Sequence, residues 1–296
     1  MVQHHSLTGA TGISRLLRLA GSAAALAACG AYAHAATVQL ESTVFGQTVK
    51  YNQGTVENTT SVSNLGTTEI IGNATLENRA GATLTNSGSL KNVKQFNNAG
   101  TFTSSGTVIG QGEYKQPGGQ TVLQNGTMAQ DSFNFAAGTL SGTGTLIGDV
   151  ALGVDALLTA GDSVGAMSIN GNLVSDGDFI FEIAGSGTAQ YDELTVSDAA
   201  EFDGGSMLFN FINGFNGAVG TWDVLIAGAV IDSTKLSYSV NGLANGLSWS
   251  VVDFGTGLRL QLAAVDAPAP VPLPPAFLLM LSGLGVIGWL AKRRDS

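Results

Sequence analysis

The chain has 296 residues, of which 41 are glycine, and only 11% are charged, against about 25% in an average soluble protein. Hydrophobic residues make up 44% of the chain, which is enough to bury a core and excludes a protein that is disordered throughout. The formal net charge is −10, which excludes nucleic acid as a partner because both would be polyanions.

Charge and reactive side chains are unevenly placed. Residues 36–267 hold 21 acids and 7 bases, with no base between Lys115 and Lys235. The only cysteine is Cys29, and the three histidines also lie within the first 35 residues. A mature protein without residues 1–35 therefore has no disulfide, no thiol nucleophile, no imidazole base and no usual zinc ligands.

Residues 1–35 are predicted to be a secretory signal peptide. Arg15 and Arg18 precede an apolar stretch over 19–28, which is too short to span a bilayer. Ala33 and Ala35 form a small-x-small site, so we expect cleavage after Ala35. An alternative interpretation starts from the "LAAC" at 26–29, which resembles a bacterial lipobox and would make Cys29 a lipidated N-terminus.

Large apolar residues recur every six positions in the segment 36–135. The clearest run is Leu84, Leu90, Phe96, Phe102 and Val108, with Ile70 and Leu76 upstream and Asn86, Asn92 and Asn98 at a parallel six-residue step. An even period keeps side chains on one face of a strand, and glycine and asparagine allow bends between short strands. The pattern predicts an all-β fold, a β-solenoid with an apolar core and stacked asparagines. Three hexads would make a coil of about 18 residues.

A second run occupies the segment 136–201, with Leu140, Leu146, Leu152, Leu158 and Val164 six apart. Two stretches of this region resemble segments of autotransporter passengers: "AGDSVGAMSINGNL" at 160–173 and "YDELTVSDAAEFDGGSMLF" at 191–209. In the first stretch, Ala160 and Met167 replace the Pro and Leu of that pattern. The resemblance covers roughly residues 135–262 and implies a right-handed β-helix-like body. Longer strands follow over 202–263 and are expected to form a β cap, and 264–275 is a proline-rich linker.

The segment 276–296 is predicted to be a transmembrane helix with a basic tail. Residues 276–291 are uncharged and mostly apolar and span about 24 Å as a helix, against a hydrocarbon thickness of about 30 Å. Leu273–Pro275 and the stem of Lys292 extend the span. Lys292, Arg293 and Arg294 are expected on the cytoplasmic side, with the body outside.

This tail carries a second resemblance. The residues that carry the resemblance are Val271, Pro272, Leu273, Pro274 and Pro275, followed by the apolar run and the three bases. They resemble the PEP-CTERM sorting signals of Gram-negative bacteria, in particular the VPLPA variant. Pro275 stands in place of the Ala of that variant. The resemblance implies processing by an exosortase and export together with extracellular polysaccharide, to the cell envelope, cell surface or extracellular matrix. The precursor of such a protein would span the inner membrane once, with its C-terminus in the cytoplasm. An ordinary single-pass tail anchor is the alternative.

The best candidates for metal binding are Asp176, Asp178 and Glu182. A strand over 178–183 would place Asp178, Ile180 and Glu182 on one face, and grouped carboxylates suit Ca²⁺. The sequence holds neither a GGxGxD repeat nor an EF-hand loop. A solvated polar strand face explains the same residues, so no cofactor is assigned and Ca²⁺ is the one candidate.

These patterns together predict an exported, non-enzymatic surface or matrix protein. Asp192 and Glu193 are adjacent, so along a strand they point to opposite faces, whereas a glycoside hydrolase needs two carboxylates at a defined separation. The alternatives are an adhesin that binds glycans or neighbouring cells and, less favoured, a β-helix polysaccharide lyase or hydrolase.

Overall fold

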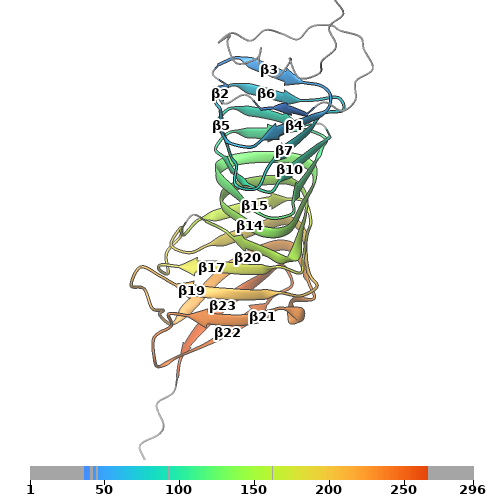
Figure 1. Cartoon of the computed structure of the whole chain (residues 1–296). Helices are drawn as coiled ribbons and strands as arrows, with labels where there is room; N and C mark the ends of the chain where they lie inside the picture. The colour runs from blue at the N-terminus through green and yellow to red at the C-terminus, as the bar shows by residue number, and fades with distance from the viewer. Residues whose placement is uncertain (1–36, 41–42, 45, 93, 162, 266–296) are drawn as a thin grey trace, which may run out of the picture. The chain divides into compact units, whose positions relative to one another are not determined.

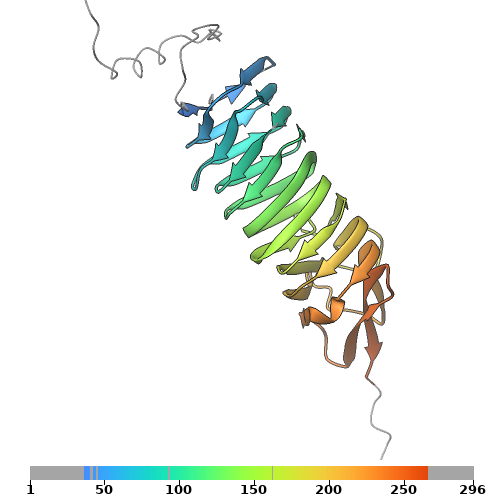
Figure 2. The ribbon, with the colours of Figure 1, turned by 90° about the vertical axis from the view of Figure 1, so that its right-hand side faces the viewer.

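The computed structural model describes residues 37–40, 43–44, 46–92, 94–161 and 163–265. Over these residues the chain is all-β, and the only helix among them is the 3-10 turn η2, Ser233–Lys235. Most strand pairs are parallel, and the chain coils as a β-solenoid (Figures 1 and 2). The predicted signal peptide and the tail from 266 onward lie outside the described residues. None of the helices in the described part is long and apolar enough to cross a membrane.

The early coils have three sides, and each side is a stack of parallel strands. The first stack contains β1 (Thr37–Gln39), β4 (Thr55–Asn58), β7 (Thr75–Asn78), β10 (Gln95–Asn98) and β13 (Glu113–Gln116). The second contains β2 (Thr43–Val44), β5 (Ser61–Asn64), β8 (Thr83–Asn86) and β11 (Thr101–Ser104). The third contains β3 (Thr48–Tyr51), β6 (Thr67–Ile70), β9 (Ser89–Asn92) and β12 (Thr107–Ile109).

The coils lengthen along the chain. The long strand β14 (Gln120–Thr159) continues all three stacks. Five further strands follow it and pair in parallel: β15 (Ala166–Asn170), β16 (Leu173–Ser175), β17 (Asp178–Ile183), β18 (Glu193–Phe202) and β19 (Ser206–Phe211). Hydrogen-bonded partners in adjacent coils are 18 residues apart at Asn86 and Ser104 and 31 apart at Asn210 and Asn241. The expected 18-residue coil therefore holds only at some positions of the early body, since Asn58 and Asn78 are 20 residues apart and Asn64 and Asn86 are 22 apart.

The apolar residues of the hexad pattern form the core. The five residues from Leu84 to Val108 in the first run are each at most 1% exposed, and Leu140, Leu146, Leu152 and Leu158 of the second run are also buried. Val164 is an exception, because it is only partly buried in the turn before β15. The six-residue step ends where that turn interrupts the strands.

Aromatic rings stack along this core. The ring of Phe96 packs edge-on against Phe102, with centroids 4.9 Å apart, and against Tyr114, at 5.0 Å. Tyr114 in turn contacts Phe133 and Phe135 of β14. Edge-on pairs add about 0.5–1.5 kcal/mol beyond the burial of their area, so neighbouring coils are joined by their side chains as well as by their backbones.

A buried ladder of side-chain amides runs beside the aromatic stack. Asn58 donates to Asn78 (2.8 Å), Asn78 to Asn98 (2.7 Å) and Asn98 to Gln116 (3.4 Å). Each asparagine also donates to a backbone carbonyl in the adjacent coil, as Asn98 does to Gln120 at 2.9 Å. The predicted asparagine stacking is confirmed for Asn98 and for Asn86, which accepts a hydrogen bond from Asn64 at 2.7 Å. The ladder satisfies polar groups that would otherwise be costly to bury.

We expect Asn98→Asp to destabilise the body strongly and Asn73→Asp, in the exposed turn before β7, to have little effect. Asn98 is fully buried, and aspartate would replace its donor with an oxygen that faces the acceptors on Gln116 and Gln120. An uncompensated buried charge costs about 3–5 kcal/mol, whereas an exposed substitution changes stability by roughly 0.5 kcal/mol or less. Urea unfolding followed by circular dichroism gives both values. Equal effects of the two variants would contradict the inward position of Asn98.

Glycines at one corner of the coil allow the chains to approach closely. A Cβ on Gly106 would lie 2.1 Å from the carbonyl oxygen of Gly88, and a Cβ on Gly88 would lie 2.1 Å from that of Gly66. Neither contact is sterically tolerable, so this corner requires glycine in successive coils.

Parallel pairing changes to antiparallel pairing near the C-terminal end of the body. β20 (Gly220–Ile231) is still parallel to β18, and β21 (Ser237–Asn241) to β19, whereas β23 (Gly257–Ala264) is antiparallel to β20 and to β22 (Leu247–Asp253). Asp223 and Arg259 join β20 to β23 through an ion pair with an N–O distance of 2.9 Å. The region predicted as a cap therefore contains two further parallel pairings before the antiparallel strands.

Candidate functional site

The three predicted calcium candidates do not converge on one point. β17 begins at Asp178, as expected, with Phe179, Phe181 and Ile183 buried on the opposite face. Asp178 accepts hydrogen bonds from the backbone N–H (2.8 Å) and the hydroxyl (2.7 Å) of Ser206. Glu182 lies four residues further along the extended strand, which separates the two by about 13 Å. Asp176 lies in the preceding turn, so the three carboxylates form no joint site.

A different acidic cluster was not foreseen from the sequence. The carboxylates of Glu201, Asp203 and Asp232 have oxygens within 4.8 Å of one another. Lys235 fills this cluster, because its ammonium lies 2.9 Å from Asp203 and 2.8 Å from Asp232. Hydrogen bonds to these two carboxylates raise the pKa of Lys235 above its usual range. The chain therefore supplies the cation that this cluster holds.

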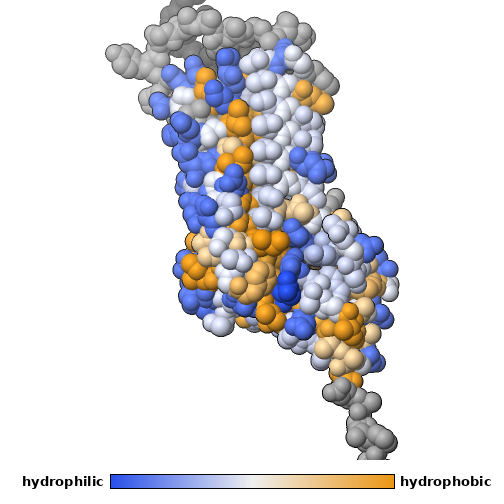
Figure 3. Space-filling model, turned by 180° about the vertical axis from the view of Figure 1, so that it is seen from behind, coloured by the Kyte–Doolittle hydropathy of each residue, from blue (hydrophilic) through white to orange (hydrophobic). Residues whose placement is uncertain are grey.

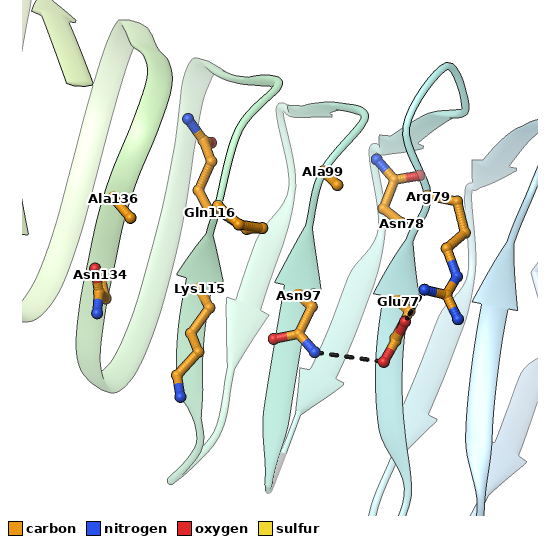
Figure 4. A pocket seen from close by; sticks show the side chains of 10 residues that line it. Glu77, Asn78, Arg79, Asn97, Ala99, Lys115, Gln116, Asn134 and Ala136 are labelled. Atoms are coloured by element: carbon orange, nitrogen blue, oxygen red, sulfur yellow. Dashed lines mark hydrogen bonds and ion pairs between the residues drawn. The ribbon is translucent and has the colours of Figure 1, made fainter. Parts of the chain in front are cut away.

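Polar residues line a shallow depression on the first stack (Figure 4). It has a volume of about 400 Å³, and Asn97 and Lys115 lie between Glu77 and Asn134 among the residues that line it. These four residues occupy successive coils at one register position, since Glu77 pairs with Asn97 and Asn97 with Lys115. The coil repeat therefore places residues about 20 apart in sequence side by side.

The charges in this depression compensate one another. Arg79 forms ion pairs with Glu57 and, at 2.7 Å, with Glu77, and Lys115 forms one with Glu113 at 3.0 Å. The hydrogen bond to Glu57 raises the pKa of Arg79. The surface therefore offers hydrogen bonds but little net charge, which suits a polar, uncharged contact better than the binding of an ion.

Among the carboxylates in the described part of the chain, Asp192 has the most strongly altered environment. It is fully buried, and its two oxygens accept hydrogen bonds from the backbone N–H groups of Gly165 and Glu182, both at 2.8 Å. Burial raises the pKa of Asp192 to about 8, and the two N–H groups oppose this shift. Its neighbour Glu193 is partly exposed, so the two adjacent carboxylates point to opposite sides of the strand.

Asp192 also explains the two segments that resemble autotransporter passengers. β15 follows the "AGDSVG" turn and pairs in parallel with β18, which follows Asp192. A Cβ on Gly161 would lie 2.7 Å from Oδ1 of Asp192, so glycine is needed for this approach. The two segments therefore lie in adjacent coils and are joined by the buried carboxylate, which gives these motif residues a structural role.

No established protein family matches the chain, and none of the curated proteins is significantly similar to it.

Proposed function

We propose that the chain is an exported structural protein of a Gram-negative cell surface or extracellular matrix, without enzymatic activity of its own. One observation carries the proposal: a body of stacked coils and the tail motif, with its apolar run and basic end, occur in a single chain. A stacked body presents the same surface on coil after coil, and the tail supplies a route to the outside.

The ends of the chain define the route in this proposal. Residues 1–35 direct export and are removed after Ala35, and the span 276–291 holds the precursor in the inner membrane with Lys292–Arg294 in the cytoplasm. An exosortase-type enzyme then cuts near Val271–Pro275, where prolines keep the backbone extended and accessible. The body released in this way is a right-handed β-helix associated with extracellular polysaccharide.

The surface of the body supports this assignment. A column of hydroxyl side chains lies in register along the third stack and consists of Thr48, Thr67, Ser89, Thr107 and Thr127. Pale columns of near-neutral residues of this kind run from coil to coil in Figure 3. Uncharged hydroxyl groups hydrate well and exchange hydrogen bonds with the hydroxyl groups of polysaccharides. The amide and aromatic ladders stabilise the coils from within, as a protein without disulfides requires outside the cell.

Replacing Lys292, Arg293 and Arg294 together by serine tests the sorting route. We expect the precursor to stop less firmly in the membrane and the processed form to fall, because the bases resist translocation through hydrocarbon. Immunoblots of membrane and extracellular fractions measure both species. Replacing Lys91 and Lys94 of the body by serine is the control, since it removes bases without touching the tail. Unchanged processing in the triple variant would show that the basic end has no part in sorting.

A further inference from the structure

A second groove runs along the second stack over the later coils. It has a volume of about 410 Å³, and the coils from β14 to β21 contribute Thr159, Ile180, Glu182, Leu208, Asn210 and Asn241 to its lining. The strands β17, β19 and β21 cross beneath it in parallel register. The groove therefore follows the direction in which the coils stack, and each coil adds side chains at the same register positions.

Three columns of side chains form this surface. Ile180 pairs with Leu208 and makes an apolar centre, with Thr159 and Ser239 at the same register position in the coils on either side. On one flank Glu182, Asn210 and Asn241 are in register, and Asn241 donates to Asn210 at 2.9 Å. The other flank holds Asp178, Ser206 and Ser237. The result is an apolar stripe between two rows of hydrogen-bonding groups.

The flanking row keeps hydrogen-bonding capacity for a ligand. Within the described part of the chain, no group donates a hydrogen bond to the carboxylate of Glu182. Asn210 uses its side-chain oxygen as the acceptor for Asn241, which leaves its amide N–H groups directed away from that bond. A donor and an acceptor therefore stand side by side on successive coils.

We infer that this groove binds a linear, uncharged glycan that lies along the stacking direction. The carbon–hydrogen face of a sugar ring fits the Ile180 and Leu208 stripe, and its hydroxyl groups reach the flanking amide, carboxylate and serine groups. Coils repeat every 4.8 Å or so, close to the advance of one sugar in an extended chain. This inference rests on the proposed function and specifies the polysaccharide partner in it.

The structure also favours a glycan over two other ligands. A peptide would bind most readily by adding a strand to a sheet edge, but here the groove lies on a sheet face whose backbone groups already pair between coils. An acidic polysaccharide would need cations on the protein, and no base occurs between Lys115 and Lys235. The remaining chemistry is that of a neutral chain of hydroxyl groups.

Titration calorimetry of the full chain in detergent tests this inference. The probes are hexamers of β-1,4-linked glucose, of β-1,4-linked N-acetylglucosamine and of β-1,4-linked xylose, with an oligouronate as the anionic comparison. We expect saturable binding of at least one neutral hexamer and none of the oligouronate. Leu208→Asp should weaken that binding by about tenfold or more, a loss of about 1.4 kcal/mol, because it places a charge in the apolar stripe beside Ile180.

Ile147→Asp is the matched control, since Ile147 is an exposed apolar residue of β14 on the third stack and does not line the groove. It should bind as the wild type does, and both variants should keep the wild-type melting temperature. No binding of any neutral hexamer, binding of the oligouronate alone, or equal binding by the two variants would overturn the inference. Tail processing is measured separately, so a permanently anchored protein that still binds a neutral hexamer would refute only the sorting route.

Discussion

Replacing Phe96 with aspartate should unfold the coils around β10. Phe96 is fully buried between Phe102 and Tyr114. Loss of a buried phenylalanine alone costs about 3–5 kcal/mol, and aspartate adds an unpaired charge in the same place. Limited proteolysis should cut the flanking coils of the variant under conditions that leave the wild type intact, and urea unfolding should show a loss at least as large as that range.

Gln95→Asp provides the matched control for this experiment. Gln95 precedes Phe96 on β10 and is partly exposed on the outer face, so its replacement should leave protease resistance unchanged. A Phe96→Asp variant as resistant as the wild type would mean that the six-residue apolar step does not define the core.

The buried carboxyl group of Asp192 should make the free energy of unfolding fall as the pH rises. Its pKa is about 8 in the folded protein, against an ordinary value of 3.8, so between these limits the folded state holds a proton that the unfolded state has released. The contribution of Asp192 to the free energy of unfolding is therefore complete below the unfolded-state pKa. Above that pKa it declines by about 1.4 kcal/mol per pH unit, until the pH reaches the folded-state pKa. Urea unfolding at pH 5, 6, 7 and 8 measures the slope.

Two variants separate this effect from other titrations. Asp192→Asn should be less stable, because its side-chain N–H₂ group faces a backbone N–H, and it should lose the slope between pH 5 and 8. Asp149→Asn should keep the wild-type slope, since hydrogen bonds from Asn172 lower the pKa of Asp149 and place its titration below this range. The same slope in Asp192→Asn and the wild type would contradict the assignment.

The sequence predicted the core well because the period of a strand is even. Leu84, Phe96 and Leu158 could be placed inward from their spacing alone, and so could Asn98 beside them. Coil length was less predictable, because it depends on how many residues the loops between the strands contain. The segment between Ile183 and Glu193 lengthens one coil without breaking the parallel pairing of β17 and β18 with their neighbours.

The candidate sites were harder to predict for the same reason. The alternation on β17 could be predicted from Asp178 and Phe179, which are adjacent in the sequence. Asp203 and Lys235 are 32 residues apart, and Ile180 reaches Leu208 only when the coil length is known. A six-residue period contains no information on coils of about 30 residues, so neither the Lys235 cluster nor the groove could be derived from it.

Intact-mass spectrometry of the native extracellular protein tests the central claim most directly. The proposal predicts a species that begins at Ala36 and ends near Val271–Pro275, without the span 276–291 and the basic residues that follow it. An extracellular species that retains residues 276–296 would contradict the sorting route and would identify the tail as a permanent anchor.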